Sequence, residues 1–286
     1  MPDTNGVLYI VATPIGNLAD ISQRALDILK SVDLIAAEDT RHSQKLLAHY
    51  GINQHMMALH EHNERERANE IINRVKSGQS IALISDAGTP LISDPGYFLA
   101  RLAHEANIRI VPIPGPSAMV AALSVAGLPT DKFVFEGFLS AKAGGRDKQL
   151  IQLKQETRTM VFYEAPHRLL ETVKAICEVF GPDRRIVLVR ELTKTYETIK
   201  QKDCQAMAEW IEENPEQQKG ESVLIIEGNR SMKEDMQTAE VNIDRLLMVL
   251  LDNMSLKDAS NKASELTGQS KNTMYKRALE LSKRES

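Results

Sequence analysis

Short apolar runs alternate with amphipathic segments through the first half of the chain. Nearly continuous apolar runs of this length are typical of parallel strands that are buried on both faces of a sheet. The amphipathic segments between them have the spacing of helices that connect parallel strands. The predicted strands are Val7–Ala12, Leu34–Ala37, Ile81–Ser85 and Ile110–Ile113, and the predicted helices are Ile21–Leu29, Glu64–Lys76 and Phe98–Ala106.

A second α/β set follows in the next hundred or so positions. It comes after a small, polar stretch, Ala141–Lys148, which contains two adjacent glycines and is expected to be a mobile surface loop. The predicted strands of this set are Met160–Tyr163, Ile186–Val189 and Val223–Glu227, and its predicted helices are Leu169–Phe180 and Cys204–Glu213.

These patterns predict an α/β protein with two α/β domains and a small helical domain at the end. We expect a first domain over residues 1–130, a second over 131–228, a polar linker over 229–240 and a helical part over 241–286. Within the last part, Gly268 separates two helical patterns and Ser270 is a candidate N-cap.

The composition of the chain indicates how many domains it can form and where in the cell we expect it. The 286 residues are 42% hydrophobic and 26% charged, which is enough for two compact domains and a short appendage. Two cysteines are too few for a disulfide framework and no stretch has the apolar length of a membrane span, so we expect a cytoplasmic protein. The formal net charge of −4 argues against binding nucleic acid through overall charge, but residues 270–286 carry five basic and two acidic side chains.

Three loops that follow predicted strands are rich in glycine, proline and small residues: Ala12–Asn17, Asp86–Gly96 and Pro112–Ala118. In open α/β sheets, ligands bind at the carboxyl ends of strands, where such residues let a ligand approach the backbone. Ordinary turns and helix caps are the alternative for each loop taken alone. None of the loops has a dinucleotide-binding or P-loop signature. We expect the three loops to converge on one crevice.

Six segments of the sequence follow one another in a recognisable order: LYIVATPIGNLADIS, AAEDTR, LISDAGTPLISDPG, PIPGPSA, YEAPHRL and RELTK. In order and spacing, over residues 8–228, they resemble the ribosomal small subunit methyltransferase I family. This resemblance implies the tetrapyrrole methylase fold, in which two α/β domains hold S-adenosylmethionine (SAM) in the cleft between them, and a homodimer. It also implies 2′-O-methylation of a cytidine near the decoding centre of 16S rRNA, within the small ribosomal subunit.

The same resemblance implies, position by position, the residues that contact the cofactor. They are Pro14, Asp86, Gly88, Ser117, Ala118, Tyr163, Glu164 and Leu192. The first turn departs from the Gly-x-Gly-Pro-Gly-Asp pattern of the wider fold, because it reads Thr13-Pro14-Ile15-Gly16-Asn17. This departure argues against a tetrapyrrole substrate.

Methyl transfer to a ribose hydroxyl needs a group that removes or polarises the hydroxyl proton, such as a carboxylate or a lysine of lowered pKa. The candidates are Glu38, Asp94 and Lys194. The alternatives are helix capping for the two acids and an internal ion pair for the lysine. The sequence has no metal-binding motif, and this chemistry requires no metal.

Several basic residues are candidates for contact with RNA. Those of the helical part belong to a region that resembles a helix-turn-helix, and we expect them to hold rRNA phosphates and so position the target strand. A solvated helix on a small packing domain is the alternative for that region. The candidates are Arg41, His167 and Arg168 in the α/β part and Lys271, Lys276 and Arg277 in the helical part.

Two other functions compete with rRNA methylation. One is another transmethylase of the same fold that acts on a tetrapyrrole or a protein side chain, against which the basic helical part argues. The other is a non-catalytic ribosome assembly factor that binds SAM and RNA without transferring a methyl group.

Overall fold

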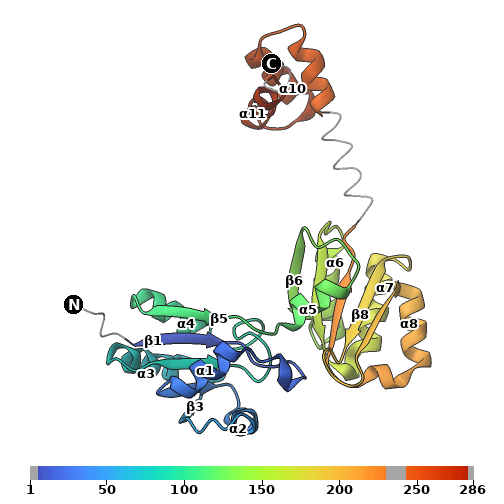
Figure 1. Cartoon of the computed structure of the whole chain (residues 1–286). Coiled ribbons are helices and arrows are strands. Elements are labelled where there is room, and N and C mark those ends of the chain that lie inside the picture. Colours follow the sequence, from blue (N-terminus) through green and yellow to red (C-terminus); the bar gives the residue numbers. More distant parts are fainter. Residues whose placement is uncertain (1–5, 230–242, 283–286) are drawn as a thin grey trace. The chain divides into compact units, whose positions relative to one another are not determined.

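The computed structural model describes residues 6–229 and 243–282. The chain divides into two compact units (Figure 1). The first comprises residues 1–153 and 159–227 and contains both sheets, and the second comprises 154–158 and 228–286. Of the linker predicted over 229–240, all but Asn229 lies outside the described residues, so that the predicted domain bounds remain a prediction.

The first sheet is entirely parallel, with the strand order β3-β2-β4-β1-β5. Apolar clusters cover both of its faces, which explains the nearly continuous apolar runs in its sequence. Its strands are β1 (Val7–Val11), β2 (Leu34–Ala37), β3 (Met56–Ala58), β4 (Ile81–Ile84) and β5 (Arg109–Ile113), and its helices are α1 (Gln23–Ser31), α2 (Thr40–His49), α3 (Glu64–Lys76) and α4 (Tyr97–Glu105). The predicted elements are confirmed to within two residues at either end, whereas α2 and β3 were not predicted.

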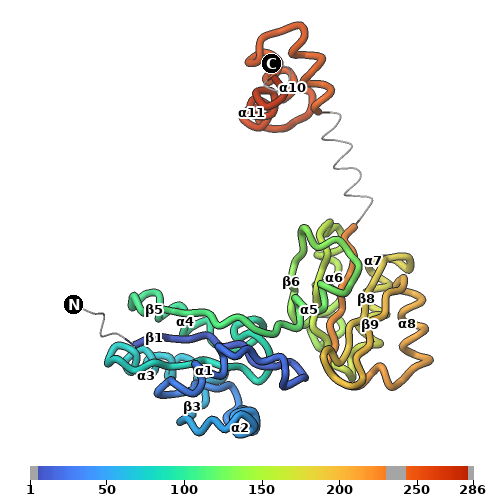
Figure 2. The backbone as a smooth tube through the Cα atoms, in the orientation of Figure 1, coloured from blue at the N-terminus to red at the C-terminus, as the bar shows by residue number. Residues whose placement is uncertain are grey.

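The strand order places β4, β1 and β5 next to one another. Because the three strands are parallel, the loops that follow them leave the sheet at the same edge. Figure 2 shows the chain passing from β5 through α5 (Ala118–Val125) into the second sheet. The three loops singled out in the sequence are therefore neighbours.

The second sheet is mixed, with the order β6-β7-β10-β8-β9. Only β6 and β7 pair in parallel, and the other pairs are antiparallel. One face packs against α7 and α8, and the other packs against α5. Its strands are β6 (Phe133–Phe138), β7 (Thr159–Glu164), β8 (Arg185–Arg190), β9 (Thr198–Asp203) and β10 (Ser222–Ile226), and its helices are α7 (Leu169–Phe180) and α8 (Cys204–Glu213). The three inner strands were predicted, and the two edge strands were not.

The segment Ala141–Lys148 is not the mobile loop that its polar composition predicted. Helix α6 spans Ala143–Leu153 and contributes Leu150 to the apolar core of the second sheet. Arg146 and Leu150 are buried at 6% and 0% exposure, and the backbone N–H of Ser140 donates to the Gln149 side chain at 2.8 Å. Packing of the second half of the helix outweighs the glycine pair near its start.

The second unit contains a small helical body formed by residues 243–251, α10 (Leu256–Thr267) and α11 (Lys271–Ser282). Its apolar core includes Leu247, Ala263, Met274, Ala278 and Leu281. Gly268 ends α10 at a φ of 71°, and the Ser270 hydroxyl accepts the backbone N–H of Thr273 at 3.2 Å, which confirms the predicted turn and cap. In the described ranges of the chain, no helix combines the length and apolarity that crossing a membrane requires.

Candidate active site

Hydrogen bonds join the three loops at the carboxyl edge of the first sheet. Thr13 and Gly88 exchange backbone hydrogen bonds of 2.8 and 3.0 Å, which join the first loop to the second. The hydroxyl of Thr89 donates to the carbonyl of Pro116 at 3.0 Å, which joins the second loop to the third. The loops therefore form one connected wall.

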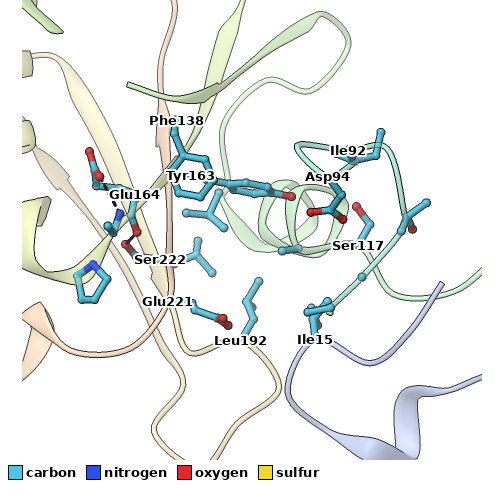
Figure 3. Close-up of a pocket in the computed structure, with 18 residues that line it drawn as sticks. Ile15, Ile92, Asp94, Ser117, Phe138, Tyr163, Glu164, Leu192, Glu221 and Ser222 are labelled. Carbon is cyan, nitrogen blue, oxygen red and sulfur yellow. Dashed lines mark hydrogen bonds between the residues drawn. The ribbon is translucent and has the colours of Figure 1, made fainter. Parts of the chain in front are cut away.

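This wall borders a cavity of about 350 Å³. The opposite side of the cavity comes from the second sheet and the loop after β8, with Tyr163, Leu192 and Ser222 (Figure 3). Apolar side chains such as Ile15, Phe138 and Val223 make up much of the lining. A concave, largely apolar pocket with a few polar groups is typical of a small-molecule site.

Six of the eight residues predicted to bind the cofactor line this cavity, namely Gly88, Ser117, Ala118, Tyr163, Glu164 and Leu192. The other two, Pro14 and Asp86, line a second cavity of about 360 Å³. Ile15, which follows Pro14 in the first turn, faces the first cavity, so this turn separates the two spaces. The sequence did not reveal this division, and it did not single out Ile15, Phe138 or Ser222.

The carboxylate of Glu164 is held by neighbouring groups of the protein. It accepts hydrogen bonds from Arg168 Nε at 2.8 Å, the Thr172 hydroxyl at 2.6 Å and the backbone N–H of Ala165 at 2.7 Å. Arg168 was predicted to contact RNA, but its side chain is only 14% exposed and is paired with Glu164. Arg168 thus fixes the start of α7, whereas the adjacent His167 is exposed.

A cluster of three carboxylates lies beside the cavity. Asp94 lines the cavity, and its Oδ2 atom is buried without a hydrogen-bond partner in the described part of the chain. The pKa of Asp94 is raised to about 6, chiefly by burial and in part by the charges of Glu38 and Asp86, against the opposing effect of a hydrogen bond from Ser85. The pKa of Glu38 is also raised, chiefly by burial and in part by Asp86. A carboxyl group with a pKa near neutrality is suited to proton transfer.

Tyr163 directs its hydroxyl toward Asp94 across the cavity (Figure 3). Burial raises the pKa of this phenol, and the nearby Asp94 charge adds to the effect. The phenol therefore stays protonated at neutral pH and can donate a hydrogen bond at this end of the cavity.

Glu38 and Asp86 are tied to each other through the backbone. The backbone N–H of Asp86 donates to Glu38 at 3.4 Å, and Asp86 in turn accepts the backbone N–H of Asp39 at 3.2 Å. Asp39 caps α2 and pairs with Arg41, whose side chain is 90% exposed. Over the described residues, no group of three or more His, Cys, Asp or Glu side chains is arranged to hold a metal ion.

Lys194 is a partner in an internal ion pair. Its ammonium group lies 2.9 Å from Glu191 and 3.0 Å from Glu221. Burial alone would lower the pKa of Lys194, but the hydrogen bonds to these two carboxylates outweigh burial and raise it. Lys194 therefore does not have the lowered pKa that a proton acceptor would need. The alternative prediction, an internal ion pair, describes this residue.

Two loops that border the cavity contain non-glycine residues in the left-handed region. Leu91 and Ser93 have φ values of 74° and 67°, and Glu191 and Thr193 have 51° and 66°. Such conformations persist only where surrounding contacts enforce them. For the Asp94 loop one such contact is Glu64, which accepts the backbone N–H groups of Gly96 and Phe98 at 3.1 and 2.8 Å. Nothing in the sequence identified Glu64, because its partners lie in another element.

Matches to protein families agree with this fold. Residues 7–208 match the family described as Tetrapyrrole (Corrin/Porphyrin) Methylases, and residues 237–282 match the RsmI C-terminal HTH domain. The crystal structure of uroporphyrin-III C-methyl transferase from Thermus thermophilus complexed with S-adenyl homocysteine covers 78% of this chain and 97% of its own, with 16% identity and a TM-score of 0.55. Fold and site therefore define a methylase of the tetrapyrrole methylase class.

Relatives that match this chain over nearly its full length identify the family within this class. The ribosomal RNA small subunit methyltransferase I of Escherichia coli O157:H7 is 51% identical over 278 residues, which are 97% of this chain and 96% of that protein. The protein of the same name from Pseudomonas aeruginosa is 51% identical over 275 residues, or 96% and 97% of the two chains. This chain belongs to the ribosomal RNA small subunit methyltransferase I family. The predicted family, fold class and enzyme class are confirmed.

Replacing Gly88 with alanine is expected to weaken SAM binding. Gly88 has a φ of +82°, and an added Cβ would lie 3.3 Å from Ile15 on the cavity wall. The backbone strain alone should cost about 1 kcal/mol. Gly51→Ala is the matched control, because Gly51 has a φ of +66° and no atom within 4 Å of the added Cβ. Calorimetry should show a lower SAM affinity for the Gly88 variant alone, and equal affinities would contradict the assignment of the cavity.

Proposed function

We propose that this protein transfers a methyl group from SAM to the 2′-hydroxyl of a cytidine in 16S rRNA near the decoding centre. The observation that carries this proposal is the match at 51% identity, over 97% of the chain, to a relative whose name states methylation of small subunit rRNA. We further propose that the substrate is encountered within the small ribosomal subunit and that the enzyme acts in the cytoplasm as a homodimer.

The cavity beside the carboxylates fits SAM in size and chemistry. Its volume of about 350 Å³ lies in the range of small-molecule sites. Gly88 and Ala118 would let a flat ring lie against the backbone, Leu192 would cover the ring, and Ser117 and Tyr163 would supply polar contacts. When bound, SAM supplies a methyl group activated by attachment to a sulfonium sulfur. A related fold carries S-adenyl homocysteine in its crystal structure, which supports this assignment.

The chain's own residues align the hydroxyl and accept its proton. The ribose oxygen would take up the methyl group that bound SAM supplies, and Oδ2 of Asp94 accepts the hydroxyl proton. That atom is buried and has no partner among the described residues, so it is available to a substrate hydroxyl. Glu38 and Asp86 keep Asp94 basic through their charges. The apolar lining excludes water from the reacting groups.

Glu38 and Lys194 have supporting roles in this mechanism. Glu38 orients the backbone of Asp86 and contributes negative charge next to Asp94. Lys194 holds the loop after β8 against the start of β10 through Glu191 and Glu221. Of the three residues first considered for proton transfer, Asp94 is the one that lines the cavity.

The decisive test of the proposed function is methylation of rRNA in vitro. Purified protein is incubated with labelled SAM and small ribosomal subunits from a strain that lacks the enzyme, and the label is mapped by nucleoside analysis. We expect one labelled 2′-O-methylcytidine in 16S rRNA. Tight SAM binding without transfer would favour the non-catalytic assembly factor, and label in a protein or a tetrapyrrole would favour the other transmethylases.

Asp94→Asn is expected to lower the single-turnover rate by roughly 10²–10⁴ while leaving SAM affinity nearly unchanged. With a pKa of about 6, Asp94 is the carboxylate above pH 6 and is progressively protonated below it. The wild-type rate should therefore fall about tenfold per pH unit below pH 6, and the variant should lack this limb. Asp131→Asn, at an exposed position outside the cavity, should behave as wild type. An unchanged pH profile in the Asp94 variant would exclude Asp94 as the base.

The helical body of the second unit is proposed to add affinity for rRNA phosphates without taking part in chemistry. Arg277 is unsuited to this role, because it binds Asp244 at 2.7 and 2.8 Å and Glu280 at 3.1 Å, which raises its pKa. It joins α11 to the helix over 243–251. Lys271 and Lys276 on α11 are exposed and take part in no ion pair of the described residues. They remain the proposed phosphate contacts.

The double variant Lys271→Gln and Lys276→Gln should bind small subunits more weakly than wild type. Each lysine that no longer binds a phosphate should reduce the slope of log affinity against log salt by about 1, while SAM affinity stays the same. Lys257→Gln on α10 is the control, because it removes one exposed charge from the neighbouring helix. Binding equal to wild type at every salt concentration would show that α11 serves another purpose.

A further inference from the structure

A groove beside the first turn carries a set of basic side chains that the site described above does not use. This second cavity, of about 360 Å³, is bounded by Pro14 and Gly16 on one side and by α2 on the other. His42, Lys45 and His49 line it from α2. Their spacing of three and four residues places all three on one face of the helix.

These basic groups are available to a ligand. All three side chains are exposed, and none takes part in an ion pair of the described residues. Arg168, Lys194 and Arg277, by comparison, are each held by carboxylates. An exposed lysine without a partner can neutralise an anion without first breaking an internal pair.

The groove adjoins the carboxylate cluster. Asp86 lines one end of the groove, and its backbone N–H is bound to Glu38. Ala87 and Gly88, the next two residues, line the SAM cavity. The acidic end therefore favours the hydroxyl groups of a ribose, and the basic face of α2 favours the phosphate that follows a ribose in a nucleic acid strand.

We propose that this groove binds the RNA phosphodiester backbone next to the target ribose, with Lys45 as the principal phosphate contact. The proposal rests on the proposed function, because it assumes that the target is a nucleotide of an RNA strand. In this arrangement α2 fixes the register of the strand, while Asp94 receives the hydroxyl proton. Phosphate contacts of this kind position a strand without reading its sequence.

Lys45→Gln in the full-length protein tests the proposal by binding of small ribosomal subunits across a series of salt concentrations. We expect severalfold weaker binding and a salt slope reduced by about 1, as expected when one phosphate is no longer bound. Lys45→Arg, which keeps the charge, should restore both. The matched control is Lys76→Gln, because Lys76 is exposed at the end of α3, outside the groove. SAM affinity should be the same in all four proteins, which reports that the variants are folded.

The outcomes separate this proposal from the proposed function. If wild type methylates the subunit and Lys45→Gln binds it with unchanged affinity and slope, the groove is not the phosphate site although the function stands. If Lys45→Gln and Lys76→Gln weaken binding equally, the effect is one of net charge and the proposal is overturned. If wild type neither binds nor methylates the subunit, both proposals fail. Weaker binding in Lys45→Gln alone, restored by arginine, supports the groove.

Discussion

The pair of backbone hydrogen bonds between Thr13 and Gly88 is the constraint on which the rest of the site depends. It joins the ends of two adjacent parallel strands, so that one turn separates the SAM cavity from the groove along α2. The same connection brings Asp86 to the boundary between the two spaces and sets the Asp94 loop beside them. Because these two bonds involve only backbone atoms, they do not occupy the side chains of Asp86 and Asp94.

Some charged side chains of this protein stabilise the fold by pairing with each other, and others have no charged partner and can contact a substrate. Glu164 with Arg168, Lys194 with two carboxylates, and Arg277 with Asp244 form closed internal contacts. Asp94 and the carboxylates near it lack a cationic partner among the described residues. Burial and the repulsion between these carboxylates raise the pKa of Asp94, so that Asp94 can accept a proton. Location and partners, more than residue type, therefore decide which charged side chains can act on a substrate.

Much of the fold could be predicted from the sequence where apolar residues form continuous runs or a regular helical pattern. Helices α3, α7 and α8 begin and end as predicted, whereas α2 buries only Ser43 and Leu47 and so left a weak apolar pattern. Strands β6 and β9 are edge strands with half-exposed residues, which hides them among polar segments. The loops of the site were visible in their glycines and prolines. The side of the turn that a residue faces depends on tertiary contacts that local sequence does not encode. The same holds for the pairing of Arg277 with Asp244, which lies in another helix.

The left-handed backbone at Leu91, Ser93, Glu191 and Thr193 has a consequence for how this enzyme can change. Residues in such conformations store free energy that the folded state would lose if the loops relaxed. Relaxation would also move Asp94 and the wall around Leu192 away from their present places. Substitutions that relax these two loops would therefore raise thermal stability and lower catalytic activity. Selection for thermal stability would thus reduce activity most strongly when it acts on these loops.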